Sequence, residues 1–139
     1  MAGRYGVMQK QIRPNLTALV VYNKPSICWY LARRLKEMGF DSVIEAKDSE
    51  TAMSRLRFAT LKGIDVGVIV SDAGVEFIKS VRDYPAFNRI PIVLLGNFSE
   101  LNAKFDRDIE DIICVLNPVN SDDFKDKVQE ALSKSNSSV

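Results

Sequence analysis

At residues 65–72 the chain reads Asp65-Val66-Gly67-Val68-Ile69-Val70-Ser71-Asp72. This is a short apolar run, rich in β-branched side chains, that ends abruptly in a carboxylate. Such a run predicts a strand buried on both faces, as in a parallel sheet. Open α/β sheets bind their ligands where strands of this kind end. Asp72 is therefore the first candidate for a functional residue.

Similar apolar runs alternate with helical periodicity along the rest of the chain. Strands are predicted at residues 16–22, 42–46, 90–95 and 112–116, in addition to the run that ends at Ser71. Helices are predicted at residues 25–38, 48–62, 74–84, 99–109 and 120–132, with N-cap chemistry at Lys47-Asp48-Ser49 and Asn120 and a C-cap at Gly39.

This alternation predicts an α/β fold with a parallel sheet covered on both faces. Because crossover connections are right-handed, few topologies remain. We expect a flavodoxin-like, doubly wound, five-stranded sheet with strand order 2-1-3-4-5 and five helices. Residues 1–15 are expected to be an N-terminal lead-in, residues 16–133 the domain, and residues 134–139 a polar tail or the start of a linker.

The composition excludes several classes of function. The 139 residues are 46% hydrophobic and carry a formal net charge of +1, from 19 basic and 18 acidic side chains. This balance gives no reason to expect a nucleic-acid partner. No apolar run approaches the ~20 residues of a membrane-spanning helix, and no signal segment opens the chain, so we expect a cytoplasmic protein without a membrane partner.

Most common catalytic and metal-binding motifs are also missing. The chain has no histidine, which excludes a histidine base and a histidine metal ligand within it. The turn at residues 22–26 contains no glycine, so neither a phosphate-binding loop nor a dinucleotide fingerprint is present. Cys28 and Cys114 each lie in an apolar element and are expected to be core residues, not a disulfide or metal pair. We expect a protein that is not an enzyme.

Two aromatic side chains are predicted to lie on the surface. Trp29 falls on the outer side of the first helix, one turn before Arg33, where the two can stack. Trp29 is either a shielded surface residue or an anchor for a partner. Phe58 falls off the apolar stripe of the second helix.

Several stretches, taken in order, resemble the CheY-like receiver domain of bacterial response regulators. They are LVVYN, EAKDSETAMSRL, VIVSD, GVEFIKSVR, IPIVLLGN and CVLNPV, and the likeness covers about residues 16–133. In that family two acidic residues and an acceptor aspartate hold Mg²⁺, and the aspartate takes a phosphoryl group. A lysine neutralises charge, and a Thr or Ser and an aromatic residue report the modified state.

The resemblance places Asp72 at the acceptor position, but the other key positions are changed. Tyr22 and Asn23 stand where the family has its acidic pair. Gly96 replaces the Thr or Ser, Cys114 the aromatic residue and Asn117 the lysine. Mg²⁺ prefers octahedral oxygen ligation with one or two carboxylates, so its binding is expected to be lost or very weak and no cofactor is expected. The resemblance thus implies a degenerate receiver, or pseudo-receiver.

The leading hypothesis is a phosphorylation-independent interaction module in bacterial signal transduction. Two alternatives stay open: an atypical receiver phosphorylated on Asp72, and a small-ligand-binding domain that uses the crevice around Asp72. Asp72 is alternatively only the turn or N-cap residue of the third helix, and a rival alignment makes Asp65 the acceptor.

The resemblance also implies where protein partners bind. It suggests the face formed by the fourth helix, fifth strand and fifth helix, and the Trp29 face is a second candidate; a homodimer is left open. It further implies a cis peptide bond between Asn117 and Pro118.

Overall fold

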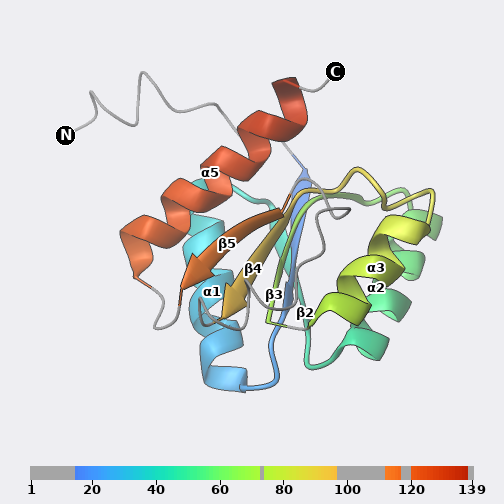
Figure 1. Cartoon of the computed structure of the whole chain (residues 1–139), viewed down its shortest axis with the longest axis horizontal. Helices are drawn as coiled ribbons and strands as arrows, with labels where there is room; N and C mark the ends of the chain where they lie inside the picture. Colours follow the sequence, from blue (N-terminus) through green and yellow to red (C-terminus); the bar gives the residue numbers. More distant parts are fainter. Residues whose placement is uncertain (1–14, 73, 97–111, 117–119, 138–139) are drawn as a thin grey trace.

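The structure is a computed structural model that describes residues 15–72, 74–96, 112–116 and 120–137. Its centre is a five-stranded sheet in which neighbouring strands run parallel, in the order β2-β1-β3-β4-β5 (Figure 1). The predicted strand order is confirmed. The strands are β1 (Leu16–Val21), β2 (Ser42–Ala46), β3 (Asp65–Ser71), β4 (Ile92–Gly96) and β5 (Ile112–Leu116).

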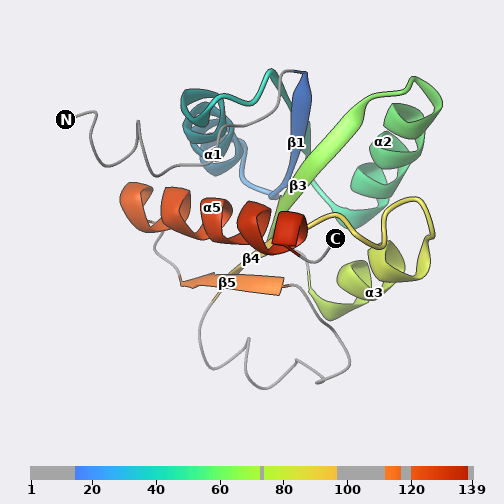
Figure 2. The same ribbon diagram turned by 90° about the horizontal axis from the view of Figure 1, so that it is seen from above.

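Helices cover both faces of the sheet. Seen from above, α1 and α5 lie on one side of it and α2 and α3 on the other (Figure 2). Each pair encloses its own hydrophobic core against the sheet, so the molecule has two cores that share five strands. The predicted helix at residues 99–109 lies outside the described residues. The described helices are α1 (Pro25–Met38), α2 (Ser49–Leu61), α3 (Val75–Asp83) and α5 (Ser121–Ser137).

Local signals set the starts of α1, α2 and α5 and the end of α1 at the predicted places. Pro25 opens α1, and Gly39 closes it in the left-handed conformation at φ 115°. The Asp48 carboxylate accepts a hydrogen bond from the Thr51 N–H at 2.7 Å at the start of α2. The Asn120 side chain likewise accepts bonds from the first turn of α5. These caps fix where each helix leaves the edge of the sheet.

The central strand contains an irregularity that the sequence analysis did not predict. Its register with β1 shifts between Val66 and Val68, so that Gly67 is an extra residue, as in a β-bulge. Val66 therefore packs in the core under α2 and α3, whereas Val68 packs in the core under α1 and α5. A Cβ at Gly67 would lie 2.6 Å from the Leu16 side chain, which explains the glycine.

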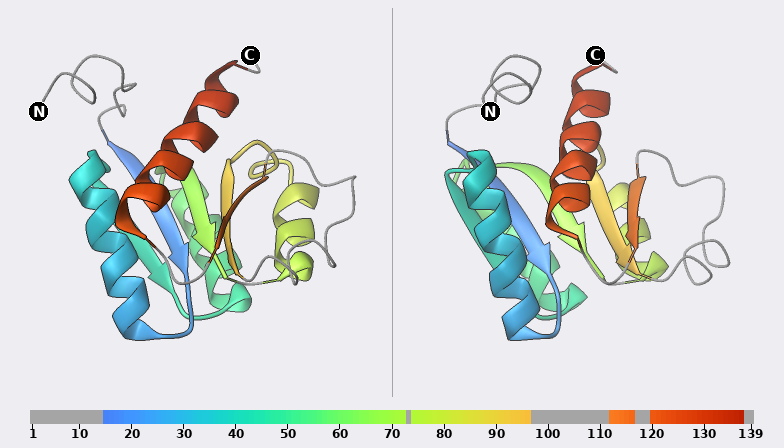
Figure 3. Two further views of the ribbon diagram at one scale, coloured as in Figure 1. Left: turned by 60° about the vertical axis from the view of Figure 1, so that its left-hand side comes forward. Right: turned by 90° about the vertical axis from the view of Figure 1, so that its left-hand side faces the viewer.

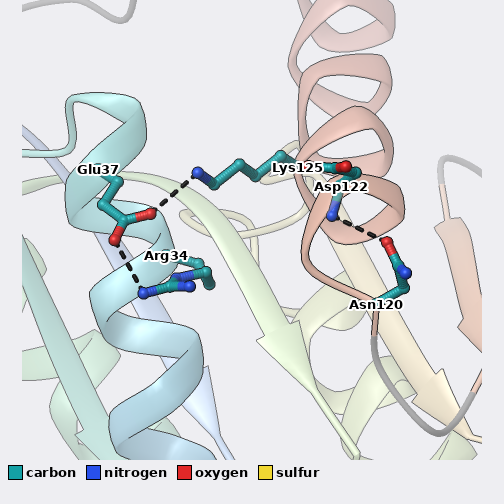
Figure 4. A network of polar contacts seen from close by, with 5 residues as sticks. All are labelled: Arg34, Glu37, Asn120, Asp122 and Lys125. Atoms are coloured by element: carbon teal, nitrogen blue, oxygen red, sulfur yellow. Dashed lines mark hydrogen bonds and ion pairs between the residues drawn. The ribbon is translucent and has the colours of Figure 1, made fainter.

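The two helices on one face are tied together by charged side chains. The Glu37 carboxylate of α1 accepts bonds from Lys125 of α5 at 2.9 Å and from Arg34 at 2.8 Å (Figure 4). The Arg34 guanidinium also lies over the Tyr30 ring, 5.0 Å from its centroid. The Glu37–Lys125 contact joins residues that are 88 positions apart in the sequence.

Two predicted boundaries were wrong. The helix α5 continues to Ser137, past its predicted end at residue 132. No glycine or proline occurs between Ser121 and Ser137, and extending an existing helix is far easier than nucleating one. β4 begins at Ile92, two residues later than expected, because Pro91 has no N–H to donate to the ladder. Within the described residues, none of the helices has the length and apolarity that a membrane span requires.

Candidate functional site

The carboxyl ends of the strands meet along one edge of the sheet (Figure 3). Backbone bonds draw three of these ends together. The Tyr22 N–H donates to the Ala46 carbonyl at 2.9 Å, and the Asp72 N–H donates to the Val21 carbonyl at 3.1 Å. The residues after β1 and β3, including Asn23, therefore lie side by side, as the resemblance required.

Asp72 sits in surroundings that oppose its charge. Burial raises the pKa of the Asp72 carboxyl above its ordinary value, and its own backbone amide offsets only part of that rise. Neither influence comes from a cationic side chain. Burial also raises the pKa of the Tyr22 phenol, and the negative charge of Asp72 raises it further. The phenol is therefore a neutral group beside a disfavoured carboxylate.

Two other interpretations of the acidic residues are wrong, namely Asp72 as an N-cap and Asp65 as the acceptor, whereas Asp72 as a turn residue stays a prediction. The N-cap residue of α3 is Gly74, and no side chain caps that helix, so Asp72 is not its N-cap. The N-cap lies two residues beyond Asp72 in the sequence. Asp65 is the first residue of β3 and lies at the opposite end of the strand from Asp72. It cannot belong to the carboxyl-edge site.

The remaining family positions are placed only in part. Gly96 is the last residue of β4, at the same edge as Asp72. Cys114 lies within β5, opposite Leu94, and its side chain is outside what the structure describes. Asn117 and the Asn117-Pro118 bond also lie outside the described residues, so the lysine position and the cis bond stay predictions.

Among the described residues, the side chains at the family's metal-site positions are poorly matched to Mg²⁺. They offer a phenol, an amide and one carboxylate, from Tyr22, Asn23 and Asp72. Mg²⁺ binds through one or two carboxylates in near-octahedral geometry, and a protonated phenol is a poor ligand for it. Across the described part of the chain, no three acidic or cysteine side chains gather closely enough to hold a metal ion.

A pocket of about 280 Å³ opens beside this site, on its β2 side. It lies between the start of α1 and the first turns of α2. Asp72 is not part of its wall, and the crevice expected around Asp72 stays a prediction. The pocket is lined by Tyr22, Asn23, Pro25, Cys28, Glu45, Ala46, Lys47, Thr51 and Arg55.

The pocket contains residues that the sequence analysis missed as site residues. Cys28 is buried, which confirms its core assignment, and burial with the adjacent Glu45 carboxylate raises the pKa of its thiol to about 12. Glu45, Lys47 and Arg55 lie in the stretch EAKDSETAMSRL, but the resemblance assigns them no role, and only the three-dimensional fold brings them to one pocket. Their alternation with apolar residues in β2 and α2 indicates surface positions and nothing more.

The aromatic surface predictions are confirmed. Trp29 is 59% exposed, and the Arg33 guanidinium lies 5.3 Å from its ring centroid. Phe58 is also exposed, with Lys62 lying 5.5 Å over its ring. The two aromatics belong to helices on opposite faces of the sheet and do not form one patch.

No family model matches the chain, and no curated protein matches its sequence. Solved structures, in contrast, are similar to this chain in fold. The chemotaxis response regulator CheY4 of Vibrio cholerae is 22% identical, with a TM-score of 0.71 over 84% of this chain and 98% of that chain. A response regulator receiver protein from Sinorhizobium medicae is 18% identical, with a TM-score of 0.70 over 88% and 98%.

A third neighbour is the signal receiver domain of a signal transduction histidine kinase from Syntrophus aciditrophicus. It is 18% identical, with a TM-score of 0.68 over 85% of this chain and 90% of that chain. The chain thus has the flavodoxin-like fold of CheY-like receiver domains, and the resemblance seen in the sequence is confirmed at the level of fold.

Proposed function

We propose that this protein is a pseudo-receiver: a receiver-like domain that acts as a phosphorylation-independent protein–protein interaction module in bacterial signal transduction. It works in the cytoplasm and catalyses no reaction of its own. The observation that carries the proposal is the composition of the edge around Asp72, where neutral Tyr22 and Asn23 stand in place of two carboxylates.

The electrostatics of that edge argue against a phosphoryl group. Burial already disfavours one negative charge on Asp72, and an acyl phosphate would bring about two. Removing one preorganised charge-stabilising group from such a site costs on the order of 3 kcal/mol. A site that lacks its acidic pair would retain little phosphotransfer activity.

Intact-mass measurement after incubation with acetyl phosphate and Mg²⁺ tests the proposal. We expect no phosphoryl adduct on the wild-type protein, and likewise no increase in mass when Asp72→Ala is incubated in the same way. A wild-type adduct that Asp72→Ala abolishes would instead establish the alternative, a phosphorylatable receiver. An active receiver domain treated in the same way serves as the positive control.

Calorimetric titration with Mg²⁺ gives a second, independent measurement. We expect no binding isotherm in the millimolar range, because the donors at the edge are poorly matched to the ion. A saturable isotherm that disappears in Asp72→Ala would contradict the proposed loss of the metal site.

The exposed Trp29–Arg33 pair supports one surface for a protein partner. A large aromatic with a stacked cation is typical of residues that carry binding energy at interfaces. The face formed by the predicted fourth helix with β5 and α5 is the other candidate, and a homodimer through either face is an alternative to a different protein. Cross-linking in cells compares the partner captured by wild-type protein, by Trp29→Ala and by the control Phe58→Ala. Loss of the partner in Trp29→Ala alone assigns it to the Trp29 surface, and retention in both variants favours the other face.

A further inference from the structure

The pocket beside β2 has a floor of buried residues and a charged rim. The floor includes Ala46 and Cys28, whose thiol stays protonated because its pKa is raised to about 12. The exposed side chains of Glu45, Lys47 and Arg55 line the mouth, and the Glu45 carboxylate also accepts a hydrogen bond from the Cys28 thiol. A body of apolar character therefore fits the floor, and charged groups on a ligand meet the rim.

Two of the three charged rim residues are cations. Within the described residues, no carboxylate forms an ion pair with Lys47 or Arg55. The two residues come from different elements, the β2–α2 turn and the second turn of α2, yet both face the same cavity. Lys47 helps to lower the pKa of the neighbouring Asp48 carboxyl without forming an ion pair with it, so both cations remain available to attract an anion.

The start of α2 does not supply this preference through its backbone. The Thr51 N–H, which would face an anion, is already taken by the Asp48 carboxylate at 2.7 Å. The attraction must come from the Lys47 and Arg55 side chains. The Thr51 and Tyr22 hydroxyls add neutral hydrogen-bonding groups to the wall.

A second, wider depression continues the pocket along α2. It has a volume of about 600 Å³ and shares Thr51 and Arg55 with the first. Glu50, Ser54 and Phe58 complete its lining, so an aromatic ring lies at its far end. The pocket of about 280 Å³ lies near the lower end of the range for small-ligand sites, roughly 300–1,000 Å³.

We propose that this pocket binds a small organic anion, with its carboxylate or phosphate between Lys47 and Arg55 and its apolar body over Cys28 and Ala46. The site adjoins the edge around Asp72 and shares Tyr22 and Asn23 with it, although Asp72 is not in its wall. Because the charge of Asp72 already acts on the Cys28 thiol, the proposal rests on the proposed function, in which Asp72 carries no phosphoryl group. Glu45, the carboxylate in the lining, weakens anion binding unless the ligand offers it a hydrogen-bond donor.

Amide chemical shifts of the ¹⁵N-labelled full chain test the proposal with benzoate and with benzamide, its uncharged analogue of nearly the same shape. We expect saturable shifts at Ala46, Lys47 and Thr51 with benzoate, and at least about tenfold weaker binding of benzamide, the effect of losing one charged hydrogen bond. Equal binding of the two probes, or no saturable shift with benzoate or phenyl phosphate, would overturn the proposal. Phenyl phosphate binding more tightly than benzoate assigns the site to phosphates, and the reverse order assigns it to carboxylates.

Three variants locate the charge dependence. Arg55→Gln is expected to weaken benzoate binding about tenfold. Arg57→Gln is the matched control, because Arg57 lies on the same helix but outside the pocket, and binding should be unchanged. Glu45→Gln should tighten binding. Equal losses in Arg55→Gln and Arg57→Gln, or weaker binding by Glu45→Gln, would contradict the arrangement proposed here.

Discussion

At the scale of single residues, the position of Asp72 and the electrostatic environment of its carboxyl follow from different features of the chain. The carboxylate stands at the end of the central strand, where the sequence placed it. Its neighbours could be named from the sequence because the ends of parallel strands meet at one edge. The rise in its pKa could not be predicted from the sequence, because it depends on how deeply the folded chain buries the carboxyl group.

The first prediction concerns the pH dependence that this burial creates. Since the pKa of Asp72 is raised in the folded state, the folded protein binds more protons than the unfolded chain in the window above the ordinary value of 3.8. Stability is therefore lost as pH rises from 3.8 through the raised pKa. Asp72→Asn should remove that loss and be more stable than wild type at pH 7. Urea unfolding at several pH values checks this, and a less stable Asp72→Asn at pH 7 would refute it.

A second residue-scale prediction concerns Gly67. A methyl group there would collide with Leu16, which is itself buried, and overpacking of this kind typically costs about 1–3 kcal/mol. We expect Gly67→Ala to lower the free energy of unfolding by that amount. Gly74→Ser is the control, because a Cβ at Gly74 meets nothing within 4 Å and serine is a good N-cap residue. Similar stabilities for the two variants would show that the strand adjusts without cost.

At the scale of elements, capping signals were the most reliable guide. Asp48, Asn120 and Gly39 begin or end helices as predicted, because a cap depends on a few neighbouring residues and little on the rest of the fold. The shift in β3 at Gly67 could not be predicted, since it arises from pairing with β1, 50 residues earlier in the sequence. The pocket beside β2 was missed for the same reason.

The N-cap of α5 gives the element-scale prediction. The Asn120 side chain accepts bonds from the Asp122 and Asp123 N–H groups at 3.0 and 3.1 Å. Asn120→Ala leaves both donors without that partner and should cost about 1 kcal/mol. Asn120→Ser keeps an oxygen acceptor and should recover most of the loss. The free energy of unfolding in urea measures both variants, and an equal loss in the two would exclude capping as the cause.

At the scale of the whole molecule, the sheet separates two hydrophobic cores. Ile113 packs in the core under α1 and α5, and Ile78 in the core under α2 and α3. Trimming either to valine should cost about 0.5–1.5 kcal/mol. Because the sites lie on opposite faces, their effects should add within about 0.5 kcal/mol. Equilibrium unfolding of the two single variants and the double variant tests this, and a larger deviation would mean that the sheet transmits strain between its faces.

The position of Trp29 on the outside of α1 has a practical consequence for such measurements. It is the chain's one tryptophan, and water already reaches its indole in the native state. Intrinsic fluorescence will therefore change little when the protein denatures, and circular dichroism is the better signal for melting curves. The same indole becomes a sensitive reporter of anything that settles over α1, since its emission would shift to shorter wavelength as water is displaced.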